Sequence, residues 1–153
     1  MRARDLMSYP AIACHVNDSL ASAARQMWEH DCGSLAVVKD EGVLTGMVTD
    51  RDICMAAYTQ GRPLEEILVH SAMASHVVCA TDDVGIEDIE RMMAEHQIRR
   101  VPIIDADHRP IGMVTIADLA TECVKPASHL QQGRFAHTLA SIERRRQPST
   151  QEA

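Results

Sequence analysis

The sequence predicts an α/β fold in which two β-α-β-β-α repeats pack against each other with pseudo-twofold symmetry. Two observations predict this fold. The chain of 153 residues aligns with itself at a constant offset of 66 residues, without gaps, from residue 7 to residue 119. Each copy also shows the same succession of β runs and helix-period stripes and ends in the pattern G-x-x-T-x-x-D. A unit of about 60 residues buries little surface alone, so the two copies should share a core.

The self-alignment depends on matched residues along most of the chain. GMVTDRDI at 46–53 falls on GMVTIADL at 112–119. Further matched pairs are Met7 and Met73, Leu20 and Ile86, Arg25 and Arg91, Met27 and Met93, and His30 and His96. We therefore predict a first domain at 1–66, a second at 67–125, and a C-terminal helical or disordered tail at 126–153.

Each repeat is predicted to contain the same elements in the same order. The first is a short β segment, at 11–14 or 76–80, followed by the helix-start signals Asn17-Asp18-Ser19 or Thr81-Asp82-Asp83. The apolar faces of the helices that follow are Leu20, Ala23, Ala24 and Met27 in one copy and Ile86, Ile89, Met92 and Met93 in the other. Two β runs joined by a polar turn come next, at 35–39 and 43–49, or at 101–105 and 110–115. A second helix then begins within 49–57 or 115–123, and residues 61–72 connect the repeats.

The composition excludes several classes of function. Aromatic residues make up 3% of the chain and the formal net charge is −7, which argue against base-stacking platforms and a general nucleic-acid surface. No apolar run is long enough for a membrane span, and the N-terminus has no signal-peptide core. The five cysteines are scattered without a CxxC pair, which indicates reduced thiols rather than structural zinc. We therefore expect a cytoplasmic protein without a metal, a membrane partner or a nucleic-acid partner.

The pattern G-x-x-T-x-x-D allows a structural and a functional explanation. Thr49 ends a strand and precedes a helix, so its hydroxyl can cap that helix, and the charge of Asp52 suits the helix dipole. The same junction offers free N–H groups, where threonine could add a hydroxyl for a phosphate and aspartate could accept hydrogen bonds from a ribose diol. Gly46 lets another backbone or a ligand approach closely. Together these residues indicate a nucleoside-phosphate site without a Walker or GxGxxG loop.

This duplication closely resembles the tandem cystathionine-β-synthase (CBS) domain pair over residues 6–122. The most specific passages are CGSLAVVKDEGVLTGMVTDRDI at 32–53 and HQIRRVPIIDADHRPIGMVTIADL at 96–119. The resemblance implies a regulatory module that binds an adenosine compound such as AMP, ADP, ATP, NAD or S-adenosylmethionine in clefts between the sheets. It implies an adenine nucleotide as a regulatory ligand rather than an obligatory cofactor, a homodimer, and a regulated partner protein that the sequence does not identify.

The resemblance also assigns roles to individual residues. Asp52 and Asp118 would hold ribose hydroxyls, and Thr49 and Thr115 would meet the phosphate. The segments that would flank the adenine are Pro10, Ala11 and Ile12 in the first copy and His76, Val77 and Val78 in the second. The residues that would line the clefts are Gly33, Ser34, Arg99 and Arg100.

The two copies differ most at Arg99 and Arg100, which align with Gly33 and Ser34. Successive side chains of a strand point to opposite faces, so we expect one of the two arginines to face its cleft and bind phosphate. The alternative is that both arginines pair with surface acids such as Asp105 or Glu95. The phosphate role predicts that Asp118, in the copy with the arginines, holds the more tightly bound nucleotide.

Two other functions compete with ligand sensing. An enzyme is disfavoured, because none of the eight histidines stands beside a serine or cysteine in a catalytic signature. An interaction or dimerisation scaffold that binds no ligand is the alternative, and the tail is its best support. A partial helical stripe is formed there by Leu130, Phe135, Leu139 and Ile142. Gly133 weakens this helix, and 147–153 is typical of disorder.

Overall fold

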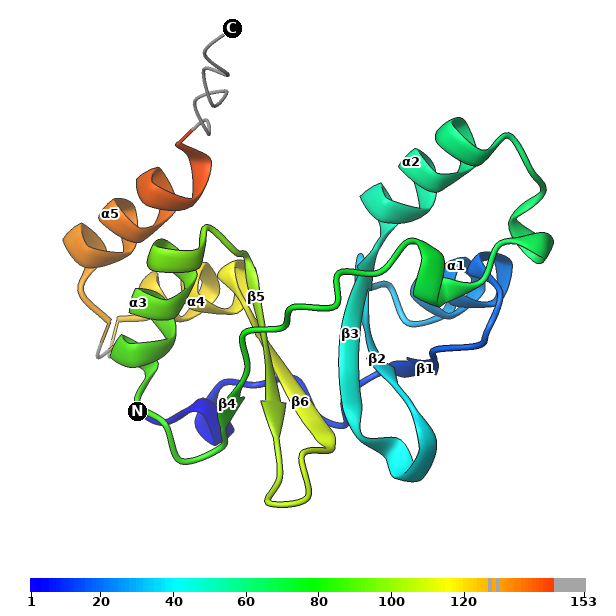
Figure 1. Ribbon diagram of the computed structural model, residues 1–153. Coiled ribbons are helices and arrows are strands. Elements are labelled where there is room, and N and C mark those ends of the chain that lie inside the picture. The colour runs from blue at the N-terminus through cyan, green and yellow to red at the C-terminus, as the bar shows by residue number, and fades with distance from the viewer. Residues whose placement is uncertain (127, 129, 145–153) are drawn as a thin grey trace, which may run out of the picture.

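The computed structural model describes residues 1–126, 128 and 130–144 (Figure 1). It contains two three-stranded sheets of the same topology. The first holds β1 (Ala13–His15), β2 (Ser34–Val38) and β3 (Leu44–Thr49), and the second holds β4 (Ala80–Thr81), β5 (Arg100–Ile104) and β6 (Pro110–Thr115). In each sheet the first strand runs parallel to the central strand and the third runs antiparallel to it. The predicted α/β fold of two equivalent repeats is confirmed.

Two helices belong to each repeat and lie on the outer sides of the paired sheets (Figure 1). They are α1 (Leu20–Glu29) and α2 (Asp50–Gln60) in the first repeat and α3 (Ile86–His96) and α4 (Ile116–Cys123) in the second. Ser19 caps α1 as predicted, because its hydroxyl accepts a hydrogen bond from the N–H of Ser22. In the second repeat the segment Thr81-Asp82-Asp83 instead forms a turn in which the Thr81 hydroxyl donates to Asp83, and α3 begins after Gly85.

Buried apolar residues form one core within each repeat and a smaller one between the sheets. The first core gathers Leu20, Leu35, Val48 and Ile53, and the second gathers Ile86, Val101, Val114 and Leu119. The core between the sheets consists of Ala36, Leu44 and Ile104, with Met47 and Val77 packed against it. The sheets therefore share apolar contact along the pseudo-twofold axis, where clefts between the repeats can form.

Each repeat is completed by the chain segment that precedes the other repeat. Ala3 is buried in the core of the second repeat, and its N–H donates to the carbonyl of Val84 at 2.8 Å. Val69 is buried in the core of the first repeat, and its N–H donates to the carbonyl of Asp18 at 2.8 Å. The segments at the start of both predicted domains thus pack across the boundary.

The tail forms α5 (Gln132–Glu143), which packs against α3 and α4. Of the predicted stripe, Leu130, Phe135 and Ile142 contact the core of the second repeat, while Leu139 is exposed. Gly133 lies in the first turn of α5 without preventing the helix. The stretch 147–153, for which disorder is predicted, lies outside the described residues.

Candidate functional site

Thr49 and Asp52 form a reciprocal capping box at the junction of β3 and α2. The Asp52 N–H donates to Thr49 Oγ1 at 3.2 Å, and Asp52 Oδ2 accepts hydrogen bonds from the Thr49 N–H and hydroxyl, both at 2.8 Å. Thr115 and Asp118 repeat this arrangement between β6 and α4, with distances of 3.2, 2.8 and 2.7 Å. The structural explanation of the repeated pattern, a helix cap, therefore holds in both copies.

The capping box leaves each aspartate able to bind a ligand but occupies the threonine hydroxyl. The only hydroxyl hydrogen of Thr49 is donated to Asp52, so the hydroxyl has none left for a phosphate oxygen. Asp52 uses Oδ2 for the cap, and within the described residues no hydrogen bond reaches its Oδ1. In this geometry Thr49 orients the Asp52 side chain, and Oδ1 of Asp52 can accept hydrogen bonds from the hydroxyl groups of a diol.

One cleft between the repeats, here named the Asp52 cleft, has a volume of about 490 Å³. It brings Thr49 and Asp52 together with Val77 and Val78 of the second repeat. Its other lining residues are Met47, Arg51, Ala74, His76, Gln97, Ile98, Arg99, Arg100, Pro102, Ile142 and Glu143. The cleft is thus lined by apolar side chains, by the two acids Asp52 and Glu143, and by three arginines.

The second cleft, here named the Thr115 cleft, has a volume of about 370 Å³. It combines Thr115 of the second repeat with Ile12 and Ser34 of the first. Ala11 and Asp118 are not among the residues that line either cleft. The segments predicted to flank the adenine therefore share a cleft with the threonine of the opposite repeat. Aligning the two copies with each other does not reveal this pairing.

Arg99 and Arg100 line both clefts but point to different neighbours. Arg99 pairs with Glu143 at the end of α5. A Cβ built on Gly33 would lie 3.1 Å from Nη2 of Arg100 and 3.1 Å from Oδ2 of Asp50, so Arg100 reaches over the first repeat. Arg99 thus pairs with a surface acid, as the alternative explanation expects, although the acid is Glu143 of the tail and not Asp105 or Glu95. Among the described residues, Arg100 makes no ion pair.

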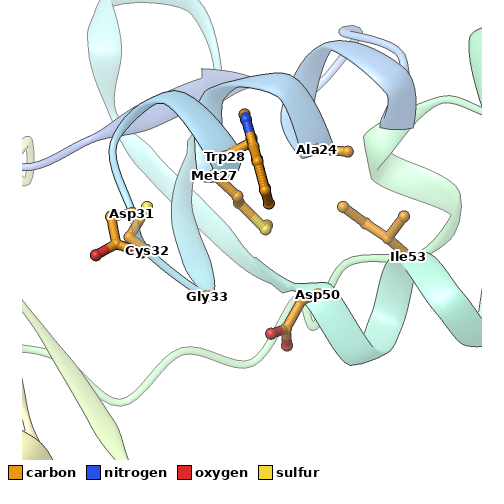
Figure 2. Close-up of a pocket in the computed structure, with 8 residues that line it drawn as sticks. All are labelled: Ala24, Met27, Trp28, Asp31, Cys32, Gly33, Asp50 and Ile53. Atoms are coloured by element: carbon orange, nitrogen blue, oxygen red, sulfur yellow. The ribbon is translucent and has the colours of Figure 1, made fainter.

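Sequence reasoning missed a third hollow, here named the Trp28 groove, of about 420 Å³ (Figure 2). It lies between α1 and α2 and is lined by Ala24, Met27, Trp28, Asp31, Cys32, Gly33, Asp50 and Ile53. Trp28 is 88% exposed at its edge. At the offset of 66 residues, Ala24, Met27 and Gly33 match Glu90, Met93 and Arg99, which contact or pack beneath α5. The surface that α5 covers on the second repeat is thus open on the first.

The described residues hold no three His, Cys, Asp or Glu side chains placed to bind a metal. All five cysteines are free. Burial, assisted by the charge of Asp18, raises the pKa of Cys14 to about 12, and burial also raises the pKa of Cys79. Burial therefore favours the protonated form of Cys14 and Cys79 at neutral pH. Across the same part of the chain, no helix combines the length and apolarity that a membrane crossing requires.

Comparison with known sequences identifies the family. The CBS domain matches the chain twice, at residues 3–58 and 65–125. The chain belongs to the CBS-domain family. The CBS domain-containing protein YhcV of Bacillus subtilis is 37% identical over 117 residues, which cover 76% of this chain and 81% of YhcV.

Two solved CBS structures are similar in fold. The CBS domain pair of protein MJ0100, solved in complex with 5′-methylthioadenosine and S-adenosyl-L-methionine, is 27% identical with a TM-score of 0.72, covering 79% of this chain and 94% of that one. Hypoxic Response Protein I, solved with two coordinated zinc ions, is 33% identical with a TM-score of 0.72, covering 86% of this chain and 100% of that one. A CBS pair similar to this chain therefore binds adenosine-containing ligands.

Proposed function

We propose that this CBS-domain chain is a non-catalytic regulatory module that binds an adenosine-containing ligand in the Asp52 cleft. The observation that carries the proposal is the position of Asp52, whose capped carboxylate lies at the wall of a cleft shared by both repeats. Its unbonded oxygen can accept from a ribose diol, while Val77 and Val78 supply an apolar surface for an adenine ring.

The charges of the Asp52 cleft suit a ligand that carries phosphate. Arg51 and Arg99 line this cleft together with two acids, Asp52 and Glu143, and Arg100 lines it as well, although its guanidinium lies against Gly33. Guanidinium groups bind phosphate through charge-assisted and often bidentate hydrogen bonds. The ligands in the MJ0100 structure support the proposal that the bound compound contains adenosine. The arginines favour a compound that also carries phosphate, so AMP, ADP, ATP and NAD are the ligands to test first.

The geometry favours Asp52 over Asp118 as the ribose-binding residue of the tighter site. The sequence-based ranking placed the tighter nucleotide at Asp118 because the arginines and Asp118 lie in the same copy. In the folded chain the arginines also line the cleft of Asp52, whereas Asp118 lines neither cleft. We therefore propose the Asp52 cleft as the principal site and the Thr115 cleft as a weaker one.

A panel of adenosine compounds tests the proposal. Adenosine, 5′-methylthioadenosine, AMP, ADP, ATP, NAD and S-adenosylmethionine are titrated by calorimetry and by thermal unfolding, with GMP as the control for the base. A ligand that binds only the folded chain raises the melting temperature with increasing concentration. If no compound binds at millimolar concentration, the scaffold function replaces ligand sensing.

We further propose that the module acts as a homodimer in the cytoplasm. The helices α1 and α2 expose Trp28, Met55 and Tyr58, and the Trp28 groove between them is open, whereas α5 packs against α3 and α4 of the second repeat. A second copy that packs on the open face would bury these side chains by symmetric pairing. The five free thiols fit a reducing compartment. A ligand held between the repeats could then change how the dimer contacts a regulated protein.

A further inference from the structure

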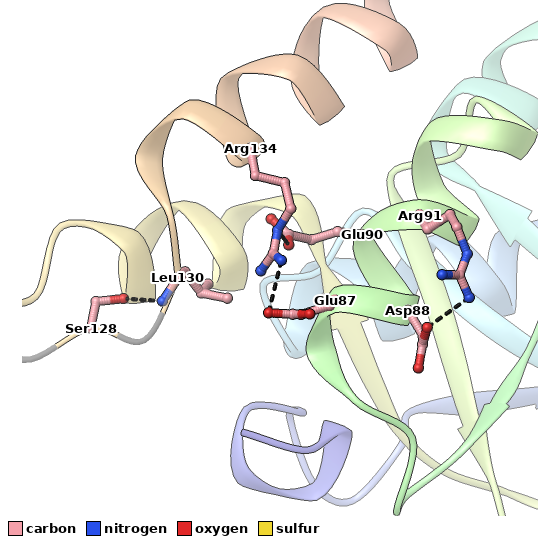
Figure 3. Close-up of polar contacts among 7 residues, drawn as sticks. All are labelled: Glu87, Asp88, Glu90, Arg91, Ser128, Leu130 and Arg134. Atoms are coloured by element: carbon pink, nitrogen blue, oxygen red, sulfur yellow. Dashed lines mark hydrogen bonds and ion pairs between the residues drawn. The ribbon is translucent and has the colours of Figure 1, made fainter.

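The helix α5 lies outside the two CBS matches and is attached to the second repeat by polar contacts along its length. Near its start, Arg134 lies against α3 (Figure 3), with Nη1 2.8 Å from Glu87 Oε1 and Nε 2.7 Å from Glu90 Oε2. At its end, Nε2 of Gln97 donates to the carbonyls of Ser141 and Arg144 at 3.2 and 3.1 Å. The two ends of the helix thus have separate attachments.

The start of α5 is attached by buried groups. Glu90 is 1% exposed, and Leu130 and Thr138 are also buried. The charge of Arg134 opposes the effect of burial on the Glu90 carboxyl. A buried charge left without its partner is strongly unfavourable, so this attachment resists separation.

The end of α5 is attached by the buried side chain of Ile142 and by an exposed ion pair, and it lines the Asp52 cleft. Ile142 and Glu143 line that cleft, and Glu143 pairs with Arg99. The side chains of Arg99 and Glu143 are 55% and 51% exposed. Exposed ion pairs contribute little to stability, whereas a phosphate can engage a guanidinium through two parallel hydrogen bonds. A phosphate in the cleft is therefore a strong competitor for Arg99.

We infer that Glu143 competes with ligand phosphate for Arg99, so that phosphate-bearing adenosine ligands release the Glu143 side chain and loosen the last turn of α5, while uncharged ones leave the ion pair in place. This inference rests on the proposed function of the Asp52 cleft. Glu143 is then a specificity-determining residue, because it lowers the affinity of the cleft for phosphate without affecting the adenosine moiety. Release of Glu143 would also transmit occupancy of the cleft to the surface of α5.

Calorimetry on Glu143→Gln tests the competition with AMP and with 5′-methylthioadenosine, which shares the nucleoside but has no phosphate. The variant should bind AMP about 2- to 5-fold more tightly, the effect expected from losing an exposed ion pair, and methylthioadenosine unchanged. Glu87→Gln is the matched control, since it makes the same charge change on the Arg134 attachment, away from the clefts. The control should leave both affinities unchanged.

Hydrogen exchange supplies a second measurement on the unmodified chain. AMP should speed exchange of the backbone amides at 140–144, and methylthioadenosine should not. An unchanged ratio of the two affinities in Glu143→Gln, or slower exchange at 140–144 with AMP, overturns the inference while leaving the proposed function intact. Absence of binding by every adenosine compound, in both the wild-type chain and Glu143→Gln, overturns both.

Discussion

Gly46 on β3 lies directly beneath Met73 of the segment that connects the repeats. A Cβ on Gly46 would come within 2.6 Å of Met73 Sδ and 3.0 Å of the Ala74 carbonyl oxygen. Gly112 on β6 lies in the same way beneath Met7, at 2.5 Å from Sδ, and beneath the Ser8 carbonyl, at 2.8 Å. The repeated glycine therefore admits a crossing backbone, whose bridges join Met47 to Ala74 and Ser8 to Met113.

Gly112→Ala should destabilise the chain by about 1–3 kcal/mol, because the new methyl group forces apart a backbone contact that cannot relax easily. Gly46→Ala should cost less, since its nearest backbone atom is farther away. Urea unfolding measures both changes. Gly133→Ala is the control in α5, where a Cβ meets nothing within 4 Å, and it should be neutral or stabilising by up to about 1 kcal/mol. Equal stability of the Gly112 and Gly133 variants would contradict the crossing contact.

Asp52→Ala should weaken the tightest adenosine-ligand site about 10- to 150-fold, the effect of losing a hydrogen bond to a charged acceptor worth about 1.5–3 kcal/mol. Asp118→Ala is a matched control, because it removes the equivalent capping box, which costs each variant about 0.5–2 kcal/mol of stability. Calorimetry below both melting temperatures compares the two affinities. Loss of the tight site in Asp118→Ala alone would restore the sequence-based ranking.

Arg134→Met should destabilise the chain more at about pH 8 than at about pH 5. Burial already raises the pKa of Glu90, and removing the guanidinium raises it further. At pH values between the pKa of Glu90 in the unfolded chain and its higher pKa in the folded variant, the folded chain binds more protons than the unfolded chain. The free energy of unfolding therefore falls as the pH rises through this interval. Arg134 lowers the pKa of Glu87 through a hydrogen bond and its charge, so the contribution of Glu87 changes below the ordinary carboxyl range and not between these two pH values.

Urea unfolding of Arg134→Met at both pH values measures this difference, whose upper limit is about 3–5 kcal/mol for an unpaired buried charge. The double variant Arg134→Met with Glu90→Leu lacks the buried carboxyl and should lose most of the pH dependence. A flat pH profile in the single variant would show that the Glu90 carboxyl is not buried as described.

Trp28→Asp should convert a dimer into a monomer of 16.9 kDa in light scattering, because a charge would replace a large apolar side chain in the proposed contact. The substitution should leave the melting temperature of the monomer nearly unchanged, since Trp28 is exposed. Tyr9→Asp alters another exposed aromatic residue, outside the α1–α2 face, and should leave the dimer intact. A monomeric wild-type chain at micromolar concentration would contradict the dimer.

The sequence by itself determined the fold of this chain, because local signals and a constant internal offset agree along its length. The pairing of Thr49 with Asp52 and of Thr115 with Asp118 was readable in the same way, since a capping box joins residues three positions apart. The stripe in the tail also predicted a helix, although it did not indicate the surface that the helix covers.

Only the tertiary structure decided which residues share a cleft. Asp52 shares a cleft with Val77 and Arg99 because the two sheets pack about an axis that brings distant segments together. A self-alignment shows which residues of the two copies are equivalent, but not which of them come into contact. The contact of Glu143 with Arg99 likewise depends on how α5 crosses α3, which the buried pair of Arg134 and Glu90 directs. Local spacing specifies helices, strands and caps, whereas the composition of a cleft between repeats follows from long-range packing.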